Sequence, residues 1–133
     1  VPTEHGVVLK DGRKLFALCA VDALGLPNML ARDATITSRC GWCKGEIVIG
    51  VEGGEIVSQS RPGIWIWSPG RQRVPAAETC CPLVKFFCSR EHLGEWTAAN
   101  PGPAAQGHGT ALDQAYPGIR ECWKNYGETI GMR

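Results

Sequence analysis

The sequence predicts an α+β domain, in which small antiparallel or mixed sheets are flanked by helices toward both ends of the chain. Short β-branched runs, separated by Gly, Pro and Asp turn signals, predict strands in the middle of the chain. An Ala- and Leu-rich stretch near the N-terminus and a capped segment after residue 89 predict helices. With 133 residues and no internal repeat, residues 1–133 are expected to form a single domain.

The N-terminal segment contains the helix on which the functional interpretation depends. Residues 1–10 predict a lead-in that ends at a turn at residues 11–12. Residues 15–24, Leu-Phe-Ala-Leu-Cys-Ala-Val-Asp-Ala-Leu, predict a helix, and Gly25 and Pro27 are its stop signals. Because this helix is apolar on every side, we expect it to be buried.

Four segments in the middle of the chain have strand character. Gly53-Gly54 between two apolar runs predicts a hairpin. The predicted strands are residues 34–38, 46–51, 55–57 and 63–67. Residues 68–79 are typical of a loop, and the apolar residues 83–87 predict a strand or a buried segment.

Two helices are predicted in the last third of the chain. Ser89 is a good N-cap for a helix that ends near Asn100-Pro101. Residues 100–109, rich in Pro, Gly and Ala, predict a loop. A final helix is expected over residues 110–116, with a possible continuation past Pro117.

Charge and hydropathy exclude several classes of function. The net charge of +1 and the scattered basic residues give no support for binding nucleic acid or an anionic membrane. No apolar run reaches the roughly 18 residues that a membrane span needs. The N-terminus lacks the basic and apolar regions of a secretion signal, so we expect a cytoplasmic protein.

Seven cysteines are unusual for a domain of this size. Their odd number and irregular spacing do not fit a disulfide scaffold, which indicates free thiols in a reducing compartment. A free cysteine is most often a small buried hydrophobic residue. The functional alternatives are soft-metal binding and nucleophilic chemistry.

Cys19 and Asp22 lie three residues apart in the predicted buried helix, so they are expected to share one face. A carboxyl group in an apolar helix is costly unless it is paired or neutral, and burial favours its protonated form. The two side chains therefore form a candidate thiol nucleophile beside a candidate general acid or base. The alternative is that Asp22 only bonds a backbone group or an arginine.

The remaining cysteines allow several interpretations. Cys80-Cys81 lies between a loop and an apolar segment, where it could line a pocket. Cys40-x-x-Cys43 could be redox-active, half of a zinc site or only a turn. A zinc site made by Cys40, Cys43, Cys80 and Cys88 is conceivable. His5, His92 and His108 are expected to be solvated rather than to bind a metal.

Three segments in register resemble the active-site motifs of alkylmercury lyases. They are Leu-Cys-Ala-Val-Asp-Ala-Leu at 18–24 followed by Pro27, the strand 34–40 ending in Cys40, and Cys-Pro-Leu-Val-Lys-Phe-Phe at 81–87 followed by Trp96. The resemblance covers roughly residues 9–125 and implies the catalytic domain of an alkylmercury lyase without the family's N-terminal helical domain. Leu83 and Lys85 replace histidines that often occur in the third motif, and the Cys43 of the CxxC is not typical of the family.

The resemblance implies a role for three residues. Cys19 and Cys81 match the two cysteines that bind mercury during catalysis, and Asp22 matches the catalytic aspartate. Cys40 matches a structural cysteine, whereas Cys43, Cys80, Cys88 and Cys122 have no assigned role. The expected reaction is protonolysis of a carbon–mercury bond, with Cys19, Cys81 and Asp22 around the metal.

This chemistry has consequences for cofactors and partners. Mercury arrives as substrate and leaves as product, so no cofactor is expected. Low-molecular-weight thiols or a mercuric reductase are expected to remove the Hg(II) as part of mercury resistance. The runner-up function is a non-enzymatic thiolate protein that binds mercury, copper or zinc. A thiol–disulfide protein using Cys40 and Cys43, or a structural module, are further alternatives.

Overall fold

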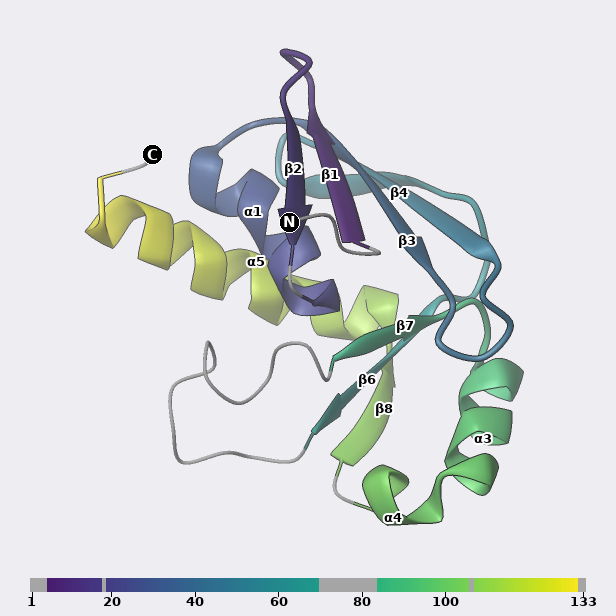
Figure 1. Cartoon of the computed structure of the whole chain (residues 1–133). Helices are drawn as coiled ribbons and strands as arrows, with labels where there is room; N and C mark the ends of the chain where they lie inside the picture. The colour runs from purple at the N-terminus through teal and green to yellow at the C-terminus, as the bar shows by residue number, and fades with distance from the viewer. Residues whose placement is uncertain (1–4, 18, 70–83, 106, 132–133) are drawn as a thin grey trace.

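The α+β prediction is confirmed by the computed structural model, which describes residues 5–17, 19–69, 84–105 and 107–131 (Figure 1). The described strands form two antiparallel sheets. The larger sheet has the order β2-β1-β3-β4-β5, with β1 (His5–Leu9), β2 (Lys14–Ala17), β3 (Ala34–Arg39), β4 (Glu46–Glu52) and β5 (Glu55–Gln59). The smaller sheet has the order β7-β6-β8, with β6 (Trp65–Pro69), β7 (Lys85–Phe87) and β8 (Gly107–Ala111).

Four helices accompany the two sheets in the described part of the chain. They are α1 (Ala20–Leu30), α3 (Arg90–Ala99), α4 (Pro101–Ala104) and α5 (Leu112–Thr129). Helices α1 and α5 lie side by side, and α3 and α4 lie against the smaller sheet at the opposite side of the molecule (Figure 1). None of the described helices is long and apolar enough to cross a membrane.

The larger sheet follows the alternation that predicted its strands. In β4 the side chains of Ile47, Ile49 and Val51 are buried, whereas their neighbours are half-buried or exposed. Gly53 and Gly54 both adopt positive φ, 60° and 80°, which suits the two-residue turn between β4 and β5. The predicted strand at 34–38 and the predicted hairpin are therefore confirmed.

The first seventeen residues depart from the prediction. The turn at residues 11–12 is present, with Asp11 Oδ1 accepting from the backbone N–H of Arg13 at 3.0 Å. The segments on either side of it pair as β1 and β2, so the expected lead-in is a strand and the helix predicted from residue 15 is wrong there. Pairing with a neighbouring strand outweighs the helix propensity of a four-residue Leu- and Ala-containing segment.

Helix α1 begins later and ends later than predicted. Cys19 is its N-cap, with extended backbone (φ −152°, ψ 177°), and the helix continues through Gly25 and Pro27 to Leu30. Gly25 is buried because α5 lies so close that a Cβ at this position would overlap the ring of Trp123. The glycine that seemed a stop signal is thus a point of close helix packing.

The C-terminal third confirms the two long helices. Helix α3 begins after Ser89, whose hydroxyl accepts from the N–H of His92 at 3.1 Å, and it ends at Ala99. Helix α5 passes through Pro117. The loop predicted at 100–109 is wrong in part, because it contains α4 and the start of β8. The loop predicted at 68–79 is wrong for residues 68 and 69, which belong to β6, and the rest of it lies outside the described residues.

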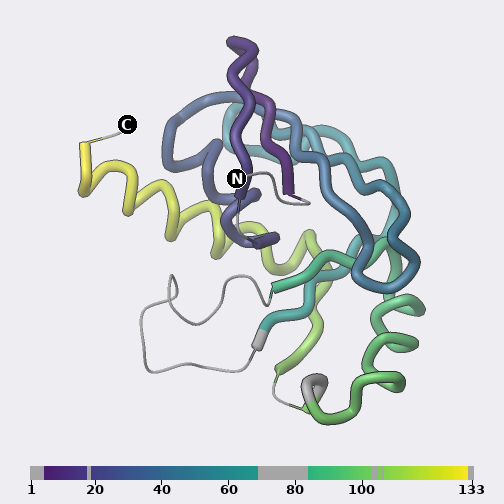
Figure 2. Tube along the Cα trace, viewed as in Figure 1, coloured from purple at the N-terminus to yellow at the C-terminus, as the bar shows by residue number. Residues whose placement is uncertain are grey.

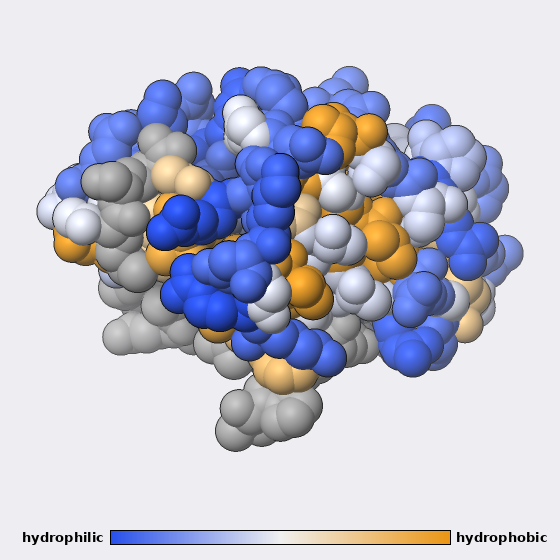
Figure 3. Space-filling view, turned by 90° about the horizontal axis from the view of Figure 1, so that it is seen from above, coloured by the Kyte–Doolittle hydropathy of each residue, from blue (hydrophilic) through white to orange (hydrophobic). Residues whose placement is uncertain are grey.

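The two sheets share one hydrophobic core and meet where β3 ends. The backbone N–H of Gly41 donates to the carbonyl of Phe86 at 2.8 Å and so joins the turn after β3 to β7. Figure 2 shows the same turn, in blue, beside the green start of α3. Seen from above, hydrophilic side chains form a band through the middle of this face, with apolar side chains on either side of it (Figure 3).

Candidate active site and a second thiol cluster

Cys19 lies at the junction of β2 and α1 and is fully buried. As N-cap it stands at the end of the helix where backbone N–H groups lack partners within the helix. The N–H of the next residue, Ala20, donates to the carbonyl of Val84 at 3.4 Å. Cys19 is therefore held between the first turn of α1 and the chain that leads into β7.

Asp22 occupies the first turn of α1, three residues after the N-cap. It is half-buried rather than enclosed in an apolar helix, so the expected burial of this carboxyl group is only partial. A carboxylate in the first turn is favoured by the partial positive charge of the helix N-terminus. The expected shared face inside a helix is therefore replaced by a shared helix end. Cys19 and Asp22 still place a thiol and a carboxyl group at the beginning of α1.

The third predicted residue, Cys81, and its neighbour Cys80 lie outside the described residues. Val84 follows Cys81 by three positions and is itself described and buried. Its carbonyl accepts from Ala20, the residue after Cys19. The middle of the third motif therefore contacts the beginning of the first motif.

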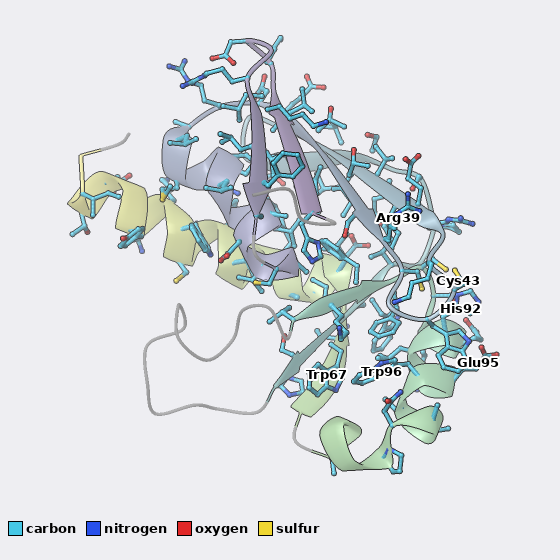
Figure 4. The ribbon with its side chains drawn as sticks, in the orientation of Figure 1. Arg39, Cys43, Trp67, His92, Glu95 and Trp96 are labelled. Atoms are coloured by element: carbon cyan, nitrogen blue, oxygen red, sulfur yellow. The ribbon has the colours of Figure 1, made fainter. Side chains whose placement is uncertain are left out.

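A second group of thiols lies elsewhere. The ligand atoms of Cys40, Cys43, Cys88 and His92 all lie within 4.8 Å of one another, and no other such group occurs in the part of the chain that the structure describes. The Sγ atoms of Cys43 and Cys88 are 3.6 Å apart. His92 Nδ1 lies 2.7 Å from Cys88 Sγ and 3.7 Å from Cys40 Sγ. Figure 4 shows Cys43 and His92 converging between the β3–β4 turn and α3.

Two separate segments position this cluster. Cys40 follows β3 directly and Cys43 lies in the turn to β4, whereas Cys88 follows β7 and precedes the Ser89 cap of α3. His92, four residues later, lies in the first turn of α3 and so comes back over Cys88. Sheet pairing on one side and helix capping on the other thus bring the four side chains together.

Burial and hydrogen bonding act in opposite directions on two of these thiols. Burial opposes ionisation of Cys40, but the backbone N–H groups and the His92 side chain around its sulfur outweigh burial and lower the pKa of the thiol to about 6. Burial, with the neighbouring Cys43 and Cys40 thiols, raises the pKa of Cys88 to about 12. The cluster therefore holds thiols of very different acidity side by side.

Three of the four cysteines of the conceivable zinc site can be located in the structure. Cys40, Cys43 and Cys88 come together as expected, whereas Cys80 lies outside the described residues. His92 was expected to be solvated, but it is half-buried and belongs to the cluster. The signal that could have indicated His92 is the spacing Cys88-x-x-x-His92 across a helix start, which brings the two side chains to the same side.

The remaining histidines and Cys122 do not belong to the cluster of Cys40, Cys43, Cys88 and His92. His5 was also expected to be solvated, but it is buried, and its Nδ1 lies 2.7 Å from the Ser38 hydroxyl. His108 is exposed, as predicted. Cys122 is an exposed thiol on α5. The surface depression between β1, β3 and β4 contains no cysteine and lies away from Cys19.

Comparison with known proteins gives a consistent result. A sequence profile described as alkylmercury lyase matches residues 1–118. Alkylmercury lyases of Pseudomonas putida and Bacillus cereus are both 32% identical to the chain, over 95 and 105 residues. These matches cover 69% and 77% of the chain but 44% and 47% of the relatives, so the chain spans about half the length of the curated relatives it matches.

A solved structure extends the similarity to the fold. The mercury-bound form of MerB2 superposes with a TM-score of 0.82 at 30% sequence identity. The superposition covers 96% of this chain and 60% of that chain. The described arrangement of sheets and helices is thus shared with a protein known in a mercury-bound form.

Proposed function

The chain belongs to the alkylmercury lyase family, and on that premise we propose that it cleaves the carbon–mercury bond of an organomercurial substrate by protonolysis. The observation that carries the proposal is the placement of Cys19 and Asp22 at the N-terminus of one helix. We propose Cys19 and Cys81 as the mercury ligands and Asp22 as the residue that moves the proton.

Cys19 is suited to bind the substrate first. Mercury(II) is a soft ion and prefers thiolate ligands over nitrogen and oxygen. The partial positive charge at the start of α1 favours a thiolate at the N-cap. Because Cys19 is fully buried, its sulfur would take one coordination position of an R–Hg⁺ cation at a place shielded from bulk water.

Cys81 is proposed as the second thiolate. A first thiolate binds an alkylmercury cation but leaves its carbon–mercury bond intact. A second thiolate adds electron density to the metal, so that the carbon gains carbanion character and accepts a proton. The hydrogen bond between the Val84 carbonyl and the Ala20 amide supports this assignment. Val84 is three residues after Cys81, and Ala20 is the residue after Cys19.

Asp22 is proposed to transfer the proton. It would accept a thiol proton as mercury binds and deliver it to the carbon, as a general base and then a general acid. Two thiol protons are displaced in all: one ends on the hydrocarbon, and the other goes to solvent. Because Asp22 is half-buried, it can face the buried sulfur and still exchange protons with water.

The remaining parts of the proposal follow from this reaction. The products are a hydrocarbon and Hg(II) held by Cys19 and Cys81, and no resident cofactor takes part. Low-molecular-weight thiols, or a mercuric reductase, would take the metal, which suits a cytoplasmic location. The single core shared by both sheets supports treating residues 1–133 as one catalytic domain.

The test is release of methane from methylmercury, or benzene from phenylmercury, by reduced protein with excess thiol. Release is expected from the wild-type chain and is expected to disappear in Cys19→Ser and Cys81→Ala. Cys122→Ser is the matched control, since Cys122 is an exposed thiol on α5 and should leave the rate unchanged. Tight mercury binding without hydrocarbon release would contradict the proposal.

The alternative function is a non-enzymatic soft-metal binder, and the cluster of Cys40, Cys43, Cys88 and His92 favours it specifically. A pure thiolate binder has no use for a carboxyl group beside Cys19. The hydrocarbon assay separates the two functions, because a binder takes up the metal but leaves the carbon–mercury bond intact.

A further inference from the structure

We propose that Cys40, Cys43, Cys88 and His92 bind one zinc(II) ion. This site is distinct from Cys19 and Asp22. Val84 contacts the residue after Cys19, and Cys88 lies four residues further along an extended segment that includes β7. At about 3.3 Å per residue, Val84 and Cys88 are roughly 13 Å apart.

The distances fit a tetrahedral zinc site. With Zn–S of about 2.3 Å and Zn–N of about 2.0–2.1 Å, the edges of a Cys₃His tetrahedron are about 3.8 Å between sulfurs and about 3.5 Å between sulfur and nitrogen. The Cys43–Cys88 separation is 3.6 Å, and the Cys40–His92 separation is 3.7 Å. The Cys88–His92 separation of 2.7 Å is shorter, so the imidazole would withdraw by about 0.8 Å to take its position.

Backbone amides already point at the sulfurs. The N–H of Trp42 donates to Cys40 Sγ at 3.4 Å, and the N–H of Gly45 donates to Cys43 Sγ at 3.3 Å. Both bonds run from the residue two positions after the cysteine. The Cys88 N–H also donates to Cys40 Sγ at 3.4 Å. Such outer hydrogen bonds orient thiolate ligands before a metal binds, which is a feature of built metal sites.

The backbone and the surrounding charges suit a bound zinc–thiolate group. Lys44 adopts a positive φ of 63°, an unusual conformation for a residue with a side chain, and it closes the turn that carries Cys40 and Cys43. Three thiolates and one Zn²⁺ leave a single negative charge. Arg39 Nη1 donates to the Lys44 carbonyl at 3.1 Å, and a Cβ at Gly45 would lie 3.0 Å from Arg61 Nη2, so two guanidinium groups flank the turn.

The donor set favours zinc over the other candidates. Four ligands arranged as three thiolates and one imidazole form a closed tetrahedral structural site for zinc. A site for copper(I) needs only soft sulfur donors, and mercury(II) is satisfied by two thiolates on one axis. The ion would join the β3–β4 turn of one sheet to the β7–α3 junction of the other, and so brace the part of the chain that follows Cys81.

The experiment measures metal in the whole chain. The protein is produced with zinc in the medium, purified under reducing conditions and assayed for metal by mass spectrometry. We expect one zinc per chain in the wild type and a loss of most of it in Cys43→Ser. Cys122→Ser is the matched control, since it removes another exposed thiol and should keep the zinc. Cys19→Ser should also keep it, which separates this site from the proposed active site.

Cobalt(II) substitution provides a readout of geometry. The wild-type protein is expected to give the intense visible bands of tetrahedral cobalt together with sulfur-to-cobalt charge transfer. His92→Cys keeps four ligands, so it should bind cobalt and shift these bands toward those of a four-thiolate site. This variant also guards against a folding defect, because it retains the metal while it changes the spectrum.

Three results would overturn the proposal. The first is a reduced wild-type protein that takes up neither zinc nor tetrahedral cobalt. The second is a Cys43→Ser protein that keeps the full zinc content. The third is a cluster that takes mercury(II) but excludes zinc.

Discussion

The packing of α1 on α5 can be tested at Gly25. Gly25 lies in the interior of α1, and a Cβ at this position would overlap the indole ring of Trp123. In an exposed helix interior, replacing Gly by Ala stabilises a protein by about 1 kcal/mol. At Gly25 the methyl group would displace Trp123, and such overpacking costs about 1–3 kcal/mol. We therefore expect Gly25→Ala to lower the free energy of unfolding by roughly 1 kcal/mol.

Gly118→Ala is the matched control for this prediction. Gly118 is exposed in α5 and has nothing within 4 Å of its would-be Cβ, so only the gain in helix propensity of about 1 kcal/mol applies. The two variants should differ by about 2 kcal/mol in urea unfolding followed by far-UV circular dichroism. At roughly 4 °C per kcal/mol for a chain of this size, their melting temperatures should differ by about 8 °C. Equal stability of the two variants would refute the close packing of Gly25 on Trp123.

Three further outcomes are expected. Tyr116→Phe removes a hydroxyl that donates to the Gly54 carbonyl at 2.9 Å and accepts from Asn28 at 3.0 Å; its loss should cost about 1–3 kcal/mol in urea unfolding, and an unchanged midpoint would contradict this network. Asp22→Asn should slow hydrocarbon release by about 100-fold or more while circular dichroism stays unchanged, and a full rate would exclude the proton-transfer role. Ser89→Ala removes the N-cap of α3 and should lower stability by about 1 kcal/mol in thermal unfolding, whereas an unaltered melting temperature would show that the cap contributes nothing.

The elements that the sequence predicted well are those fixed by local signals. The strand at 34–38 and the hairpin around Gly53-Gly54 carry alternation and a turn that needs positive φ. Helix α3 has its N-cap serine in the expected place. In each case the information lies within a few residues, so no long-range contact was needed to choose the structure.

The errors arise where a long-range contact decides the structure. Residues 14–17 resemble the start of the helix that follows, yet they pair with β1 across a turn. Gly25 resembles a helix stop, yet it is the site where Trp123 packs. Helix propensities are worth tenths of a kcal/mol per residue, which pairing and packing easily exceed.

The candidate site divides in the same way. Cys19 and Asp22 are close in sequence, so their proximity could be predicted, whereas the position of Cys19 as N-cap depended on where β2 ends. Cys43 lies 45 residues before Cys88 in the sequence. Only the meeting of the two sheets brings the thiols of Cys40 and Cys43 to that of Cys88. His92 was missed because its role depends on that meeting.

The position of the second thiol cluster changes how the two candidate functions must be separated. Bound zinc taken by itself would indicate a metal-binding protein, and a metal-free chain would indicate a lyase. Zinc held by Cys40, Cys43, Cys88 and His92 leaves Cys19 and Asp22 available, so metal content no longer decides between them. The variant that separates the two functions is zinc-depleted Cys43→Ser. If the chain is a lyase, this variant should still release hydrocarbon through Cys19, at a rate set by the fraction of protein that stays folded. If the chain is a thiolate binder, the variant should lose its metal and release no hydrocarbon.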